Sequence, residues 1–319
     1  MGRLDRFQSL LIFAAVAVGL LLGRWPAVET VALPLVTPFL MALVFGIFAQ
    51  VSTVELRRAF SDVRLTYAAL AVNFLWTPLL AWVLGALFLR SHPDLWVGLI
   101  MLLVTPCTDW YLMFTAMARG DLAFSTAILP VNLVLQLLLL PVYLLLLGGT
   151  VVEIQLESLG ESIVLVLAIP LVAAVAVRTI LERLQDPRKR EQTYARLARL
   201  PLVFLLLAIT AMFASQGDTV LEQPIVVLLL IVPLLLFFLT NFFVAQVLRR
   251  LLRLSYAQTA SLSLTILARN SPLALAVAAT AFPDRPLIAL TLVVAPLIEL
   301  PVLALATHAL RRLEPTPSG

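Results

Sequence analysis

Residues 105–110 read TPCTDW, and they interrupt an apolar run that is otherwise typical of a membrane-spanning helix. Asp109 and the only cysteine of the chain lie in this stretch, between MLLV on one side and YLMF on the other. A charged side chain costs roughly 2.5–3.5 kcal/mol at the centre of a membrane helix. A stretch this costly indicates a functional site, or a packing kink that has to offset the same cost.

The composition indicates a membrane protein rather than a soluble one. Of the 319 residues, 62% are hydrophobic and 13% are charged, whereas a soluble domain carries roughly 25% charged residues. Apolar runs long enough to cross a hydrocarbon core of about 30 Å recur along the whole chain. We therefore predict an all-α polytopic membrane protein.

Ten such runs are separated by charged residues, prolines and glycines. The first follows Arg3 and Arg6, as in a signal peptide, but no small-residue cleavage site comes after it, so we interpret it as a retained helix. The predicted spans are residues 8–24, 31–51, 68–89, 95–118, 123–147, 160–180, 199–215, 225–248, 257–281 and 286–309.

Lysine and arginine residues predict the orientation of these spans. Eighteen of the 22 fall in chain ends and loops on the side of the membrane where the amino terminus lies. Three fall on the opposite side, and Arg269 lies inside a span. Because cytoplasmic loops retain Lys and Arg, this distribution predicts an even number of spans with both termini in the cytoplasm. The expected location is the plasma membrane, which is the inner membrane of a bacterial cell.

A basic loop, LERLQDPRKREQTYARLARL, divides the ten spans five and five. Because five is odd, the second half enters the membrane in the opposite orientation to the first, as in many secondary transporters. A shift of 163 residues places Cys107 on Asn270 and Gln136 on Glu299, which supports a repeat. The predicted single transport domain and its two inverted five-helix repeats are residues 1–319, 1–150 and 155–312, respectively.

The second unusual stretch is ARNSP, residues 268–272, in the ninth span. Pro106 and Pro272 each remove a backbone donor and clash with the preceding turn. At mid-membrane depth the freed backbone groups must be satisfied by protein or water. Interrupted helices at corresponding positions of two halves are the best sequence indication of a transport site. We therefore predict helix breaks at both prolines and a substrate site beside them.

Further polar residues lie at membrane depth. Glu299 is near the middle of the tenth span, where a carboxylate must be protonated, paired or directed to a polar cavity. Asn132 and Gln136 lie one helical turn apart in the fifth span and share a face, so we consider them candidate substrate contacts. Asn73 and Asn241 are more typical of hydrogen bonds between helices.

The segments PCTDWYLMFTAMARGD and VNLVLQLLLLPVY, and then ILARNSPLALAVA and LVVAPLIELPVL, resemble the arsenite efflux permeases of the bile acid/sodium symporter superfamily. The resemblance covers most of the chain and is densest in spans 4, 5, 9 and 10. It implies ten helices in two inverted repeats. It also implies that helices 4 and 9 are broken and cross at the substrate site, and that the helices group into a core domain and a panel domain.

The resemblance implies roles for individual residues as well. A cysteine in the fourth span and a glutamate near the carboxy-terminal end are functionally important in these permeases, and they correspond to Cys107 and Glu299. Trivalent arsenic and antimony are soft and prefer thiolate, so Cys107 would contact the metalloid; a small packing residue is the alternative. Glu299 with Asp109 would carry protons in exchange for arsenite or antimonite. Polar contacts would come from Thr108, Asn270 and Ser271.

Arg269 departs from the pattern of the family, whose ninth-helix break carries neutral polar residues, or a carboxylate and a glutamine in the sodium-coupled branch. A fixed guanidinium would repel a bound cation or stand in for one. It could equally pair with Asp109 or Glu299, or hold an anionic substrate. The alternative function is therefore a sodium- or proton-coupled carrier of organic anions with Arg269 as the counter-ion, which would survive replacement of Cys107.

Other classes of protein fit less well. One cysteine excludes an internal disulfide framework and a structural zinc cluster, and His92 and His308 lie near span ends. No phosphate-binding loop signature, filter loop or signalling domain occurs, and no histidine is placed to act with Cys107. We therefore predict neither an enzyme nor a channel, no cofactor and no nucleic-acid partner. The expected partners are the lipid bilayer, a small-molecule or metalloid substrate, and a coupling ion, a proton rather than sodium.

Overall fold

The computed structural model describes residues 8–50, 62–108, 111–184, 186–222 and 224–314. Within these ranges the chain is helical, and one isolated β-bridge is the only extended pairing. The prediction of an all-α protein is confirmed for this part of the chain. Asp109, predicted to belong to the site, lies outside the described residues.

Among the described residues, seven helices are long and apolar enough to cross a membrane, which confirms the prediction of a multi-pass membrane protein. Helix α2, in the first predicted span, has 15 residues. The fourth and ninth predicted spans each contain two shorter helices. The seven long apolar segments are Thr30–Ala49, Val63–Phe88, Leu122–Thr150, Leu159–Leu184, Arg188–Ser215, Leu228–Leu252 and Pro286–Arg312. The total of ten spans stays a prediction.

Contacts between residues divide the chain into two compact units. Unit 1 comprises residues 1–51, 154–225 and 272–293, and unit 2 comprises residues 52–153, 226–271 and 294–319. Each unit takes segments from both halves of the chain, so the units do not coincide with the predicted repeats. The repeat boundaries at residues 150 and 155 stay a prediction.

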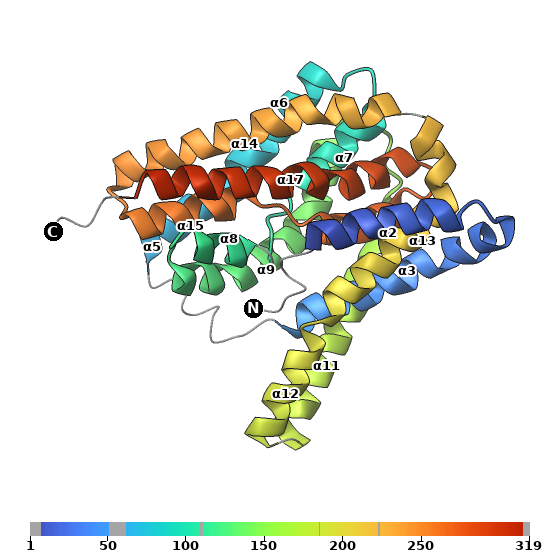
Figure 1. Cartoon of the computed structure of the whole chain (residues 1–319), viewed down its shortest axis with the longest axis horizontal. Helices are drawn as coiled ribbons and strands as arrows, with labels where there is room; N and C mark the ends of the chain where they lie inside the picture. The colour runs from blue at the N-terminus through green and yellow to red at the C-terminus, as the bar shows by residue number, and fades with distance from the viewer. Residues whose placement is uncertain (1–7, 51–61, 109–110, 185, 223, 315–319) are drawn as a thin grey trace. The chain divides into compact units, whose positions relative to one another are not determined.

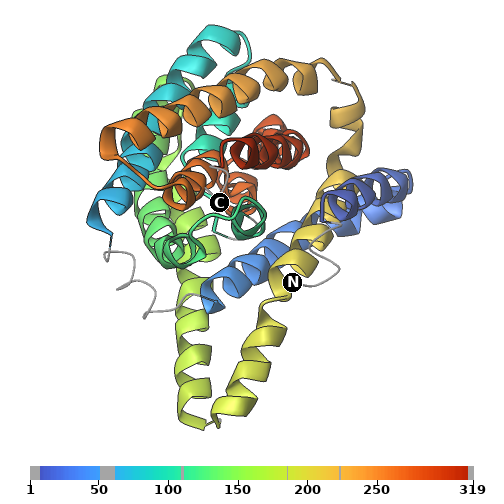
Figure 2. The same cartoon turned by 60° about the vertical axis from the view of Figure 1, so that its left-hand side comes forward.

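Unit 1 is a group of long helices packed through small residues. Helix α13 lies along α3 and α2, and α11 lies on α3, as Figures 1 and 2 show from two directions. A Cβ atom on Gly19 would come within 2.6 Å of the carbonyl oxygen of Thr210, and one on Gly46 within 2.9 Å of Pro201. Small residues let helix backbones approach this closely inside a membrane. The helices are α2 (Gln8–Leu22), α3 (Pro26–Ala49), α10 (Leu156–Ser162), the π-turn η4 (Ile163–Ala168), α11 (Ile169–Leu184), α12 (Pro187–Leu197) and α13 (Leu200–Glu222).

Unit 2 carries most of the residues that the sequence singled out. Its helices are α5 (Val63–Ala71), the π-turn η2 (Val72–Trp76), α6 (Thr77–Phe88), α7 (Pro93–Leu103), α8 (Tyr111–Met117), α9 (Leu122–Leu146), the 3-10 turn η3 (Gly148–Thr150), nearly all of α14 (Pro224–Leu252) and α15 (Tyr256–Leu267). Helix α16 (Ser271–Ala281) begins at the boundary between the units, and α17 (Pro286–Arg312) crosses it.

The core of unit 2 lies between α5, α9, α14 and α15. Buried apolar side chains of these four helices and of Val72, the first residue of η2, form one cluster, and its residues are Leu65, Ala69, Val72, Phe124, Ala127, Ile128, Val131, Ala245, Leu262 and Ile266. On α9 they recur at the spacing of one helix face. This core fixes α9 beside α15.

Polar caps connect the helix starts of unit 2. Asp62 precedes α5, and its Oδ1 accepts a hydrogen bond from the amide of Leu65 at 3.2 Å. Its Oδ2 accepts another from Nε2 of Gln258 at 2.7 Å. Gln258 also belongs to the capping box of Ser255 at the start of α15. One carboxylate therefore caps one helix and holds the cap of a second.

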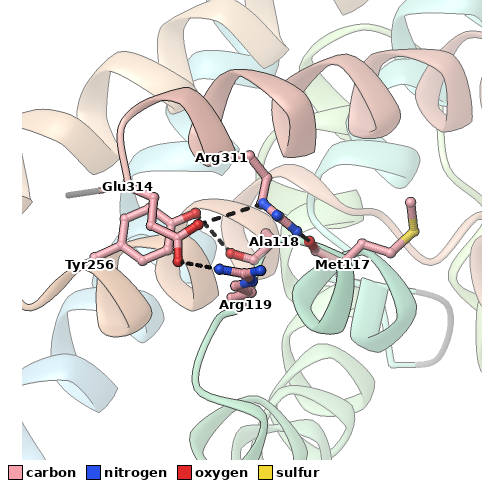
Figure 3. A network of polar contacts seen from close by, with 6 residues as sticks. All are labelled: Met117, Ala118, Arg119, Tyr256, Arg311 and Glu314. Atoms are coloured by element: carbon pink, nitrogen blue, oxygen red, sulfur yellow. Dashed lines mark hydrogen bonds and ion pairs between the residues drawn. The ribbon is translucent and has the colours of Figure 1, made fainter. Parts of the chain in front are cut away.

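A second polar network holds the carboxy-terminal end of α8 (Figure 3). Arg119 and Arg311 reach Glu314 from two sides, at 3.1 and 3.6 Å. The hydroxyl of Tyr256 donates to the carbonyl oxygen of Ala118 at 2.8 Å. Exposed ion pairs of this kind contribute little to stability, so their effect is to position the ends of α8, α15 and α17 in unit 2.

Gly85 provides a test of the packing of α6 against α7. A Cβ atom on Gly85 would lie 1.8 Å from Cδ1 of Trp96, whose ring packs on Trp82 at a centroid distance of 5.8 Å. We expect Gly85→Ala to destabilise the protein by about 1–3 kcal/mol, as overpacking does, and to lower its melting temperature in detergent. Gly160→Ala is the matched control, because nothing lies within 4 Å of a Cβ there and alanine favours a helix. Equal melting temperatures for the two variants would contradict the close α6–α7 packing.

Candidate functional site

The two unusual stretches of sequence meet as extended chain in the interior of unit 2. Pro106 and Arg269 form an isolated antiparallel β-bridge, and the amide of Cys107 donates to the carbonyl oxygen of Ala268 at 3.0 Å. Relative exposure is 3% for Cys107 and 0% for Arg269 and Ala268. We refer to residues 104–108 and 268–270 together as the crossing.

Asn270 and Thr105 complete this pairing. The amide of Asn270 donates to the carbonyl oxygen of Thr105 at 2.7 Å, and its Nδ2 donates to Oγ1 of Thr108 at 3.1 Å. The hydroxyl of Thr105 lies 3.0 Å from the carbonyl oxygen of Met101 and 2.9 Å from that of Leu102, in the last turn of α7. The crossing thus satisfies backbone groups that the ends of α7 and α15 leave without helical partners.

The side chain of Arg269 is surrounded by oxygen atoms. Its Nη1 donates to the carbonyl oxygen of Leu103 at 2.8 Å, and its Nη2 donates to Oδ1 of Asn73 at 2.9 Å. Nη2 also donates to the carbonyl oxygen of Ile266, and Nε donates to that of Leu267 at 3.4 Å. Leu103 is the last residue of α7, and Ile266 and Leu267 are the last two of α15.

The aromatic ring of Phe237, on α14, covers the guanidinium, whose Cζ lies 5.2 Å from the ring centroid. A cation at this distance is attracted to the face of the ring. The carboxy-terminal ends of helices carry partial negative charge, so α7 and α15 both offset the positive charge. Arg269 is therefore a fully buried cation that backbone oxygens stabilise.

Glu299 reaches the crossing from α17. Its Oε1 accepts a hydrogen bond from the backbone amide of Arg269 at 2.9 Å, and the residue is 2% exposed. Pro296 and Pro301 lie inside α17 on either side of it. A buried carboxylate is thus placed directly at the break between α15 and α16.

Asn132 and Gln136 are fully buried on α9. Neither side-chain amide forms a hydrogen bond with any residue that the structure describes. A buried polar group left in this state costs roughly 1–3 kcal/mol, and such a group in a native structure needs an explanation. Two of them one turn apart are a candidate contact for a polar substrate or for water.

The register of α9 against α15 shows where these two amides lie. The amide of Asp121 donates a hydrogen bond to the carbonyl oxygen of Ala257 at 3.1 Å. The hydroxyl of Ser261 donates one to the backbone carbonyl oxygen of Asp121 at 2.9 Å. The two helices therefore start side by side, and one apolar cluster joins them further along through Ile128 and Val131 of α9 and Leu262 and Ile266 of α15. Both helices rise from this common start by about 1.5 Å per residue. α15 ends at Leu267, which is ten residues beyond Ala257. The same rise along α9 brings Asn132 close to the depth of the crossing.

The remaining predicted site residues lie at the start of α16 or nearby. Ser271 is 2% exposed and is the first residue of α16, with Pro272 in second position. Proline is favoured in the first turn of a helix, where its missing amide has no partner to lose. Within the described residues, no group of three His, Cys, Asp or Glu side chains could hold a metal ion.

Sequence reasoning gave too little weight to Asn73 and did not find Phe237. Asn73 makes a hydrogen bond between helices, as predicted, but its partner is the guanidinium of Arg269. It lies in the π-turn η2, a feature that is frequent at functional sites and that the sequence does not reveal. Asn241, by contrast, donates to the carbonyl oxygen of Phe237 in its own helix at 3.2 Å.

Comparisons with known proteins agree with the resemblance seen in the sequence. The chain is 29% identical to the arsenical-resistance protein Acr3 of Corynebacterium glutamicum, over 98% of this chain and 90% of that protein. It is 24% identical to the arsenical-resistance protein Acr3 of Alkaliphilus metalliredigens, over 95% of this chain and 90% of that protein. It is also 28% identical to the uncharacterized protein YbaS of Bacillus subtilis, over 51% of this chain and 52% of that protein.

The family model described as "Sodium Bile acid symporter family" matches residues 37–223, which is more than half of the chain. Its name denotes a family of symporters, which are transport proteins. The resemblance is confirmed at this level: the chain belongs to the sodium bile acid symporter family.

Proposed function

We propose that this protein is a secondary transporter that exports arsenite or antimonite in exchange for protons. The observation that carries the proposal is the position of Cys107, which is buried in the crossing of two interrupted helices. The carboxylate of Glu299 binds the backbone amide of Arg269 in the same crossing. The names of the two Acr3 relatives support the same substrate. Cys107 would bind the metalloid, and Glu299 would carry the proton.

The chemistry of the thiol suits a carrier. Trivalent arsenic is soft and favours sulfur ligands. The thiol of Cys107 replaces one hydroxide of arsenite: an S–As bond forms, an As–O bond breaks, and the thiol proton leaves with the hydroxide as water. Oxidation states do not change, so hydrolysis reverses the step. One sulfur ligand holds the substrate less tightly than three would, which allows release.

Polar contacts would come from the amides and hydroxyls near the crossing. Arsenite carries hydroxyl groups, and Asn132 and Gln136 are buried amides without protein partners among the described residues. Thr108, Asn270 and Ser271 are further candidates. Arg269 is a poor counter-ion for an organic anion, because oxygens of the protein already occupy four of its five N–H donors.

The proposed architecture is ten spans in two inverted repeats, residues 1–150 and 155–312. The crossing pairs Cys107 with Ala268 and Thr105 with Asn270, so it joins one interrupted span from each proposed repeat. Each contact-defined unit also draws on both repeats. Both termini would lie in the cytoplasm, as the distribution of Lys and Arg predicts.

The first test is arsenite uptake into everted membrane vesicles under an imposed proton gradient. We expect Cys107→Ser, which keeps the size of the side chain but removes the soft ligand, to reduce uptake to the level of empty vesicles. Thr179→Ser, at an exposed position of α11 outside the crossing, is the control and should retain uptake. Normal arsenite uptake by Cys107→Ser, at equal expression, would contradict the metalloid proposal and favour the organic-anion alternative.

The second test separates coupling from binding. Glu299→Gln imitates a carboxyl group that is permanently protonated, so proton exchange should stop. We expect gradient-driven accumulation to be lost while exchange of internal for external arsenite continues. Glu314→Gln, in the network of Figure 3, should retain both activities. Gradient-driven accumulation by Glu299→Gln at the wild-type level would show that another group carries the proton.

The third test asks whether the unpartnered amides serve the substrate or the fold. Gln136→Met replaces a buried amide by an apolar side chain of similar size. Because the amide has no partner to lose among the described residues, we expect the melting temperature to stay the same or rise while arsenite uptake falls. Asn241→Leu is the control and should retain uptake. A clear loss of stability in Gln136→Met without a change in uptake would assign Gln136 to the fold.

A further inference from the structure

The ends of two interrupted helices in unit 2 form a cage of oxygen atoms, and Arg269 fills it. Three of the oxygens are carbonyls from the last residues of α7 and α15, those of Leu103, Ile266 and Leu267. The fourth is Oδ1 of Asn73. All four accept hydrogen bonds from one guanidinium that is completely buried.

Such a cage is what a small inorganic cation requires. In transporters with discontinuous helices, unwound carbonyls and the carboxy-terminal ends of half-helices coordinate the coupling cation. Carbonyl rings replace the hydration shell of alkali-metal ions in the same way. The two helix ends also contribute negative potential at this point. Here the positive charge in the cage belongs to a side chain.

We propose that Arg269 is a tethered cation that takes the place of a dissociable coupling cation at the crossing. A guanidinium does not lose its proton in proteins, so the charge remains in the cage throughout the transport cycle. The carrier then has no need of sodium, although its family is named for that ion. This deepens the proposed function, since it excludes sodium and leaves protons as the coupling ion.

The geometry distinguishes a tethered cation from an anion receptor. A guanidinium has five N–H groups, and four of them point to oxygens of the protein. The ring of Phe237 covers it. An anionic substrate would have to displace the carbonyl oxygens of Leu103, Ile266 and Leu267 and the side-chain oxygen of Asn73. The cage therefore fits a role in charge balance better than a role in substrate binding.

Glu299 provides a matching negative charge close by. Its Oε1 accepts a hydrogen bond from the backbone amide of Arg269. The carboxylate therefore lies beside the cage, and its oxygens are not among the four that surround the guanidinium. The tethered cation and the proton carrier have separate positions in the same site.

The test measures thermal unfolding of the purified protein in detergent, in sodium chloride and in choline chloride at equal ionic strength. Wild type should melt at the same temperature in both salts. Arg269→Ala empties the cage, so it should melt lower in choline and show a saturable rise of about 3–6 °C with sodium. Arg311→Ala is the matched control: Arg311 also donates to a carbonyl, that of Met117, but at the surface, and its removal should create no sodium effect.

Two outcomes would overturn the proposal: a saturable sodium effect on the wild-type protein, or an Arg269→Ala variant that folds and is indifferent to sodium. If Arg269→Ala does not fold in either salt, Arg269→Lys decides, because lysine retains the charge. The Arg269→Lys variant must fold, and its melting temperature must be the same in sodium and in choline. A failure to fold, or a rise in melting temperature with sodium, would refute the tethered cation. None of these measurements uses arsenite, so an absence of arsenite transport would refute the proposed function alone.

Discussion

The structure depends on the antiparallel pairing of two short stretches of extended backbone. Where α7 and α15 end inside a membrane domain, several carbonyl and amide groups lose their helical partners, and lipid cannot replace them. The pair satisfies these groups reciprocally, through Cys107 with Ala268 and Asn270 with Thr105. Either break alone would leave backbone amide and carbonyl groups unpaired, because each break supplies the hydrogen-bond partners of the other. Cys107, Arg269, Thr108 and Asn270 all lie in these two stretches.

The breaks also explain how unit 2 accommodates the charge of Arg269 in its interior, away from solvent. The carbonyl oxygens at the ends of α7 and α15 would be destabilising if they were unpaired in an apolar interior. Here they accept hydrogen bonds from the guanidinium of Arg269 and offset its charge. The amide that the break frees at the same residue becomes a donor for Glu299. Opposite charges are thus stabilised by one backbone feature. The proposed exchange of uncharged arsenite for a proton is consistent with a site whose charges are balanced in this way.

The buried amides of unit 2 fall into two groups, and the difference is informative. Asn73 accepts a hydrogen bond from Arg269, and Asn241 donates one within its own helix. Asn132 and Gln136 have no partner among the described residues, although they are equally buried. All four side chains are amides, and all four are fully buried. Only the neighbouring residues therefore distinguish an amide that stabilises the fold from one that is available to a ligand.

The sequence by itself determined the class of the protein, since composition and apolar runs require a membrane environment whatever the packing. It also indicated where the chain is interrupted, because Pro106 and Pro272 act through local geometry. Tertiary structure alone decided the partners of Arg269. They come from residues as far away as Asn73, and a guanidinium could equally have paired with a carboxylate. Which oxygens surround a charge depends on how helices meet in space, and the pattern of apolar residues along the chain does not encode that.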